Sequence, residues 1–118
     1  MAKTKGLLED LVKVEGVTAA VIVARDGFVI DGVSNRGNLE TETVGAVISA
    51  GTGSSEVMGR ELQVGTMTQG MMEFSDGLII MSLVGLDAIL AVVADIKANL
   101  GYVRFQIKKR IPEIAKAL

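Results

Sequence analysis

The segment LIIMSLVGLDAILAVVA, residues 78–94, decides the fold, because it is either a short membrane span or a pair of buried strands. Asp87 lies within it, where a charged side chain costs about 2.5–3.5 kcal/mol at the centre of a membrane-spanning helix. Gly85 also interrupts the segment, and both halves are rich in β-branched residues, which favour strands. We therefore expect no membrane span but two strands, 78–85 and 88–95, joined by a turn at Gly85–Asp87.

Three further segments have the composition of strands, at residues 17–25, 28–34 and 64–74. Asp26-Gly27 separates the first two and is typical of a two-residue type I′ hairpin. Asp76-Gly77 predicts a second tight hairpin, from the third strand into the segment that begins at residue 78. The chain therefore contains five strands connected largely by tight turns.

The polarity of these strands predicts their order in a sheet. Residues 19–24, 78–84 and 88–93 are apolar at both alternating positions, so these strands need cover on both faces of the sheet. The strand 28–34 carries Asp31, and the strand 64–74 carries several polar residues. These two strands are expected at the edges.

Helical spacing of apolar residues appears at both ends of the chain. Residues 4–15 place four apolar side chains on one face, and Gly16 follows as a terminator. Apolar residues recur at intervals of three and four from Leu100 to Leu118, where Pro112 is expected to bend or restart the helix. A middle helix is expected to start near Asn38 or Thr41, either of which suits the N-cap.

These elements predict one α+β domain over residues 1–118. The order is α-β-β-α-β-β-β-α, with a five-stranded antiparallel sheet that has the middle helix on one face and the terminal helices on the other. The core is expected to be aliphatic, since aromatic residues make up only 3% of the chain.

The stretch GAVISAGTGSSEVMG, residues 45–59, is either a helix or a glycine-rich loop. A phosphate-binding loop is excluded, because no Gly-Lys-Ser/Thr occurs in the chain and the third glycine of GxGxxG is replaced by Glu56. A mobile loop of glycine and serine is the simpler alternative to a helix. The helix is favoured by a row of residues at helical spacing: Val44, Val47, Ile48, Gly51, Ser55, Met58 and Leu62.

The strand 64–74 lacks the residues that normally protect a sheet edge. It contains neither lysine nor proline, and Glu73 is its single charge. Antiparallel pairing with its own copy would join two sheets across a two-fold axis and place two middle helices side by side. The alternative is a monomer whose edge is covered by a loop. The expected dimer interface comprises Thr66, Met67, Thr68, Gln69, Gly70, Met71 and Met72.

Composition excludes several classes of function. With no cysteine and no histidine, the chain lacks disulfides, thiolate nucleophiles, Ser-His-Asp machinery and the usual zinc ligands. A net charge of −2 argues against a dedicated nucleic-acid binder, although residues 97–118 hold six basic residues and one glutamate. The carboxylates of Asp26, Asp76 and Asp87 all lie in turns, where aspartate has a structural reason to occur. An enzyme acting through aspartate and glutamate alone is possible in principle, but each of these carboxylates has a structural explanation. We expect no metal or cofactor and assign no catalytic residue.

Two segments resemble the Roadblock family, which comprises dynein light chains of the roadblock type and MglB-like proteins of bacteria and archaea. LLEDLVKVEGVTAAVIVARDGFVI, residues 7–30, is similar to that family's first helix and hairpin. ANLGYVRFQIKKRIPEI, residues 98–114, resembles its third helix, with the Leu-Gly-x-x-Arg opening at Leu100, Gly101 and Arg104.

The resemblance implies a cytoplasmic, non-catalytic homodimer or heterodimer with a continuous ten-stranded sheet. It further implies a scaffold or regulator of a small Ras-like GTPase, docked on the paired middle helices. MglB-like members that stimulate GTP hydrolysis act by remodelling the GTPase, so no arginine finger is assigned to Arg60. The docking residues transferred by position are Glu42, Ala46, Ser49, Ala50, Gly53, Val57 and Arg60.

Two other functions are compatible with the same pattern. The first is a profilin-like or sensory domain that binds a small molecule between sheet and helix, which requires polar groups converging in an apolar pocket. The second is a light-chain-type adaptor without a GTPase partner.

Overall fold

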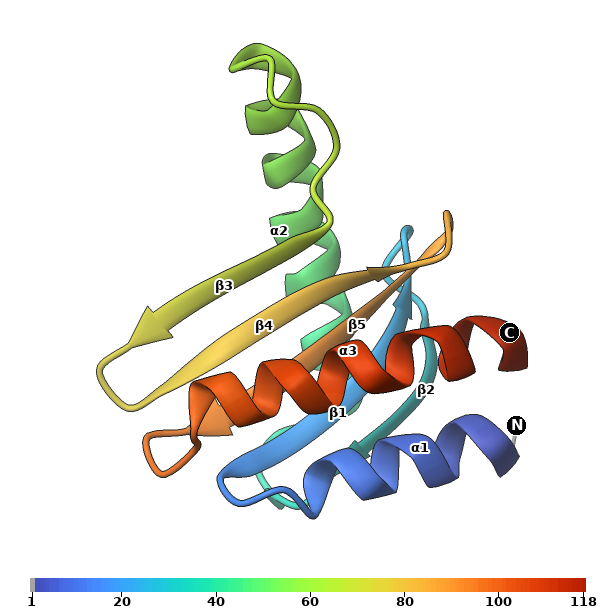
Figure 1. The fold of residues 1–118 in the computed structure, drawn as a ribbon, viewed down its shortest axis with the longest axis vertical. Helices are drawn as coiled ribbons and strands as arrows, with labels where there is room; N and C mark the ends of the chain where they lie inside the picture. The colour runs from blue at the N-terminus through green and yellow to red at the C-terminus, as the bar shows by residue number, and fades with distance from the viewer. Residues whose placement is uncertain (1) are drawn as a thin grey trace.

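The computed structural model describes residues 2–118 and shows the predicted order of helices and strands (Figure 1). The helices are α1 (Ala2–Val12), α2 (Thr41–Glu61) and α3 (Leu100–Ala117). The strands are β1 (Val17–Ala24), β2 (Val29–Ser34), β3 (Gln69–Phe74), β4 (Gly77–Val84) and β5 (Ala88–Asp95).

The five strands form one antiparallel sheet in the order β2-β1-β5-β4-β3. The three strands that are apolar at both alternating positions therefore lie inside the sheet, and the two more polar strands lie at its edges, as predicted. The segment 78–94 forms most of the β4–β5 hairpin. No helix in the described part of the chain is long and apolar enough to cross a membrane.

The sheet is covered on both faces. In Figure 1, α1 and α3 lie side by side on the near face and α2 crosses the far face, which confirms the predicted layers. Two groups of buried side chains result. The group under α1 and α3 is the larger and includes Leu8, Leu11, Ile22, Ile80, Leu90, Ile107 and Ile114. The group under α2 comprises Val21, Val23, Val44, Ile48, Met81, Ile89 and Ala91.

Individual residues explain where α1 ends and where α3 begins. Gly16 has φ +88°, and a Cβ there would lie 2.5 Å from the backbone nitrogen of Ala98, so only glycine fits after α1. The side chain of Asn99 caps α3 by accepting the Tyr102 N–H at 3.0 Å. The predicted restart at Pro112 is wrong, because α3 is a single helix from Leu100 to Ala117.

The two hairpins predicted at Asp-Gly pairs form, but with a different turn geometry from the one expected. The β1–β2 loop comprises residues 25–28: the Ala24 carbonyl accepts the Gly27 N–H at 2.9 Å, and the Ala24 N–H donates to the Phe28 carbonyl at 2.8 Å. Gly27 has φ +96°, whereas Asp26 does not have a positive φ, so the predicted type I′ turn is wrong. In the second hairpin Phe74 pairs with Gly77, so Ser75 and Asp76 form the turn and Gly77 belongs to β4.

The start of α2 and the start of β3 differ from the expectation. The N-cap of α2 is Glu40, without a capping hydrogen bond from its side chain, rather than Asn38 or Thr41. The strand predicted over 64–74 begins only at Gln69, so Thr66, Met67 and Thr68 precede it. The reason is the sharp reversal after α2, where Gln63 and Gly65 both have positive φ.

Candidate interaction site

The N-terminal half of α2 is held tightly against the β1–β2 hairpin. Val44 and Ile48 are buried in the smaller core group. A Cβ on Gly45 would lie 2.8 Å from the carbonyl oxygen of Gly27, so the glycine lets the helix backbone approach the turn. The glycine-rich stretch 45–59 lies within α2 and is helical. Gly45 is needed there for close packing against the turn.

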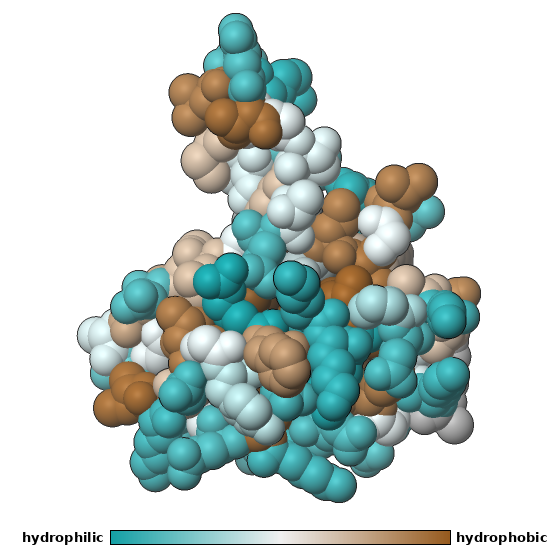
Figure 2. Space-filling model, viewed as in Figure 1, coloured by the Kyte–Doolittle hydropathy of each residue, from teal (hydrophilic) through white to brown (hydrophobic). Residues whose placement is uncertain are grey.

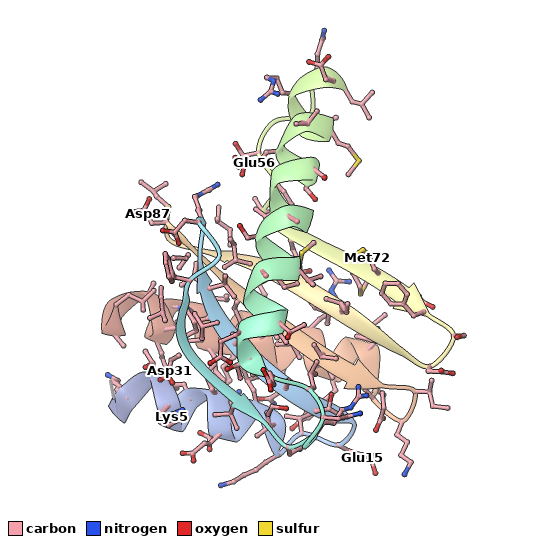
Figure 3. The ribbon with its side chains drawn as sticks, turned by 180° about the vertical axis from the view of Figure 1, so that it is seen from behind. Lys5, Glu15, Asp31, Glu56, Met72 and Asp87 are labelled. Atoms are coloured by element: carbon pink, nitrogen blue, oxygen red, sulfur yellow. The ribbon has the colours of Figure 1, made fainter. Side chains whose placement is uncertain are left out.

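Arg25 fixes the middle of α2 to two turns at one end of the sheet. Its Nη1 lies 2.9 Å from Oε1 of Glu56 in α2, and its Nε donates to the Leu86 carbonyl at 2.8 Å. The Arg25 carbonyl in turn accepts the Ser49 hydroxyl at 2.8 Å. Figure 3 shows Glu56 where α2 leaves the sheet. Arg25 was not predicted as a site residue, and its contacts arise only from the tertiary fold.

The seven docking residues predicted on α2 all fall on its outward side. Six of them are exposed, and Ser49 is half-buried because its hydroxyl bonds to Arg25. A Cβ on Gly53 would meet no atom within 4 Å, so the helix surface is open there. The exposed six are Glu42, Ala46, Ala50, Gly53, Val57 and Arg60.

An exposed aromatic ring adjoins this surface. Phe28, in the β1–β2 loop, is 75% exposed and lines a hollow of about 320 Å³ together with Ala46 and Ser49. The sequence analysis did not assign Phe28 to the site. The sequence does contain a signal for it: Phe28 is one of only four aromatic residues and directly follows the Asp26-Gly27 turn, where an aromatic side chain is apt to be exposed.

The C-terminal half of α2 extends beyond the sheet, past β3 (Figure 1). The predicted helical row is therefore only partly buried: Met58 is 55% exposed and Leu62 is 71% exposed, and Val47, Val57 and Val64 are exposed as well. Figure 2 shows hydrophobic residues gathered at this projecting end, above a largely hydrophilic face over α1 and α3. These apolar residues do share one face of the helix, but the part of that face beyond β3 has no sheet of the same chain to pack against.

The projecting end is nevertheless well formed. The Val64 N–H bonds to the Gly59 carbonyl at 2.9 Å, and the Gln63 N–H bonds to the Arg60 carbonyl at 3.2 Å. These are the two hydrogen bonds of a Schellman motif, with Gln63 in the left-handed region at φ 59°. Gly59 is buried against Gly65. The chain thus ends this helix with a defined turn rather than with fraying.

The β3 edge carries exposed apolar side chains. Met71, Met72 and Phe74 are all exposed, and Figure 3 shows Met72 on the side of the sheet where α2 lies. Beside α2 on the same side, an apolar hollow of about 150 Å³ lies between Val44 and Val47 of the helix and Ile79 of β4. Among the described residues, no side chain bonds to the backbone of β3.

The β2 edge is different, because side chains form hydrogen bonds with its backbone. Lys5 of α1 donates to the Gly32 carbonyl at 2.9 Å, and the Gly32 N–H donates to Oδ1 of Asp31 at 2.9 Å. Lys5 and Asp31 also form an ion pair at 3.0 Å, and Thr4 donates to Oδ2 of Asp31 at 2.7 Å (Figure 3). Burial raises the pKa of Asp31, but the hydrogen bonds from Thr4, Lys5 and Gly32 and the charge of Lys5 outweigh it, so the pKa is lowered.

Comparison with known proteins identifies the domain. A family model described as the Roadblock/LC7 domain matches residues 3–94. The chain belongs to the Roadblock/LC7 domain family. Two uncharacterized proteins of Methanocaldococcus jannaschii are each 36% identical to it over 108 residues, which is 92% of this chain and 93% of the relative.

Solved structures share the fold of this Roadblock/LC7 domain. MglB of Myxococcus xanthus matches with a TM-score of 0.91 at 21% identity, covering 98% of this chain and 87% of that one. The gliding protein MglB of Thermus thermophilus matches with a TM-score of 0.88 at 18% identity, with the same coverage. Profilin IB of Acanthamoeba castellanii matches with a TM-score of 0.68 at 14% identity, covering 96% of this chain and 97% of that one. These similarities show that the chain shares the Roadblock/LC7 fold.

Proposed function

We propose that this Roadblock/LC7 protein is a cytoplasmic, non-catalytic dimeric adaptor that binds a small Ras-like GTPase on its paired α2 helices. The observation that carries the proposal is the projecting half of α2, which presents Met58 and Leu62 to solvent beyond the β3 edge. An apolar helix face of this size needs cover, and a second copy supplies it.

The two sheet edges support β3 as the dimer edge. At β2, the Gly32 backbone is already bonded by Lys5 and Asp31. At β3, the backbone has no such cover and the side chains include Met71 and Met72. Of the interface residues predicted from sequence, Gln69, Gly70, Met71 and Met72 lie in the strand itself, while Thr66, Met67 and Thr68 lie in the segment leading to it. The proposed interface is therefore centred on residues 69–74.

Pairing at β3 also accounts for the exposed apolar side chains. Because α2 projects past β3, two copies joined at this edge would each place the projecting half of α2 over the partner's sheet. Met72 and Phe74 lie exposed on that side of β3. The same pairing brings the two outward α2 faces together as one surface.

The GTPase is proposed to dock on this surface. The support is membership of the family together with the exposed small residues Ala46, Ala50 and Gly53, which let a partner approach the helix backbone closely. Phe28 at the edge of the surface adds an exposed aromatic ring of the kind that anchors interfaces. In this proposal the protein provides a binding surface for the GTPase, and none of its side chains takes part in GTP hydrolysis.

Light scattering and capture test the proposal together. At micromolar concentration the protein should have twice the chain mass of 12.4 kDa, and its melting temperature should rise with protein concentration. Immobilised protein should capture a cognate small GTPase from a panel loaded with GDP or a GTP analogue. A monomer would contradict the dimer, and a dimer that captures none would favour the light-chain-type adaptor. A melting shift with small metabolites at fixed protein concentration would favour a ligand-binding domain.

A further inference from the structure

A groove runs between α3 and the β3 side of the sheet, on the face opposite α2. Its volume is about 690 Å³, and its lining includes Gln69, Ser82, Arg104, Phe105, Lys108 and Ile111. Buried α3 residues such as Val103 and Ile107 pack over the middle of the sheet. Figure 1 shows that α3 crosses β4 and β5 and leaves β3 uncovered. The groove is the space left beside the helix.

The charge in this groove is not balanced from within the chain. Arg104 and Lys108 are one helical turn apart, both are exposed, and neither forms an ion pair or hydrogen bond with a described residue. Lys5 and Arg25, in contrast, are paired with Asp31 and Glu56. No acidic residue lines the groove. It therefore offers two free cations in a chain whose net charge is −2.

The same groove has an apolar wall. Phe105 is 59% exposed and lies with Ile111 and Pro112 along the helix side of the groove. An exposed phenylalanine flanked by two cations suits a ligand that has both carboxylates and an apolar side chain. Arginine in particular binds carboxylates through two parallel hydrogen bonds.

We propose that this groove binds an acidic peptide segment of a partner protein, lying between α3 and β3. Carboxylates of the segment pair with Arg104 and Lys108, and an apolar side chain between them packs on Phe105 and Ile111. Concavity and the apolar wall favour a peptide over a nucleic-acid duplex, which would use the cations alone. They equally favour it over a flat anionic membrane, which would not enter the groove.

This surface is separate from the α2 face proposed for the GTPase. The sheet lies between them. Gln69 lines the groove and also belongs to the proposed β3 interface, where strand pairing would use its backbone. An adaptor could therefore hold a GTPase on one face and an acidic segment on the other. Because the two sites share no residue, each can be tested without the other.

The probe is a fluorescein-labelled peptide of about ten residues in which glutamate and leucine alternate, measured by fluorescence anisotropy. A matched peptide with lysine for glutamate is the charge control. The variants Lys108→Glu and Phe105→Ala should weaken binding by about tenfold or more, since each removes a direct contact. Their controls, Lys109→Glu and Tyr102→Ala, change neighbouring exposed residues of α3 that do not line the groove. The control variants should bind as the wild type does.

Three results would overturn the proposal. The first is no saturable binding of the acidic peptide. The second is equal loss for Lys108→Glu and Lys109→Glu, which would indicate unspecific attraction. The third is binding to vesicles of phosphatidylserine, weakened by Lys108→Glu, without peptide binding. Gly53→Arg on the α2 face should leave peptide affinity unchanged, so a failure of GTPase capture would be distinguishable from a failure of this site.

Discussion

Lys5 of α1 and Asp31 of β2 are joined by an ion pair of 3.0 Å at one edge of the sheet, and both also bond to the backbone of Gly32. The two sheet edges are therefore unequal. One is closed by side chains of its own chain, while the backbone of β3 is bonded by none of the described side chains. If two copies pair through β3, as we propose, we expect this difference to restrict strand-mediated assembly to a closed pair rather than an open row.

Opening the β2 edge should change the size of the assembly. The double variant Lys5→Ala/Asp31→Ala frees the Gly32 backbone, so we expect species heavier than a dimer in light scattering at high protein concentration. The free energy of unfolding should fall by about 1 kcal/mol, because the lost contacts are partly exposed. Lys3→Ala/Glu9→Ala on the exposed side of α1 is the control with the same charge change. A double variant with the wild-type mass would contradict the role of this pair.

Asp31 should also make stability depend on pH in the acid range. Its pKa in the folded protein lies below the ordinary value of 3.8. The stabilisation is therefore fully present above that value and is lost as the pH falls through the folded pKa. Urea unfolding between about pH 5 and pH 3 should show a steeper loss of unfolding free energy for the wild type than for Asp31→Asn. Parallel curves would show that Asp31 does not contribute.

Two glycines of α2 should respond oppositely to alanine. Gly53→Ala adds a methyl group in open space and should raise the free energy of unfolding by up to about 1 kcal/mol, through helix propensity. Gly59→Ala would place its Cβ 2.1 Å from the Gly65 carbonyl oxygen, so it should lower stability by about 1–3 kcal/mol. Chemical denaturation measures both. Equal changes in unfolding free energy for the two variants would contradict the close packing of Gly59 against Gly65.

The α2 face should tolerate no large charge where the GTPase docks. Ala50→Arg and Gly53→Arg place long cations on the exposed small-residue surface, so we expect loss of GTPase capture without loss of dimer mass or melting temperature. Lys109→Glu on the opposite face of the molecule is the control and should capture normally. Retained capture by both arginine variants would place the GTPase elsewhere.

The sequence was informative about the sheet and less so about α2. Strands apolar at both alternating positions, such as residues 19–24, identified the interior of the sheet, and Asp31 identified an edge. The periodicity of α2 placed Met58 and Leu62 on one face with the buried Val44 and Ile48, because spacing records which residues share a face, not what covers them. The exposure of Met58 and Leu62 shows that the helix leaves its own sheet. The contacts of Arg25 and the position of Phe28 were missed because both depend on how distant turns meet.

The central claim is that two copies pair along β3, and cysteine cross-linking tests it most directly, because the chain has no cysteine of its own. Single cysteines are introduced in turn at residues 69–74, with Ile30→Cys on the β2 edge as the matched control. Under mild oxidation we predict a disulfide-linked dimer for one or two adjacent β3 positions near the two-fold axis, and none for Ile30→Cys. Monomer at every β3 position, or a cross-link at Ile30→Cys instead, would contradict the account.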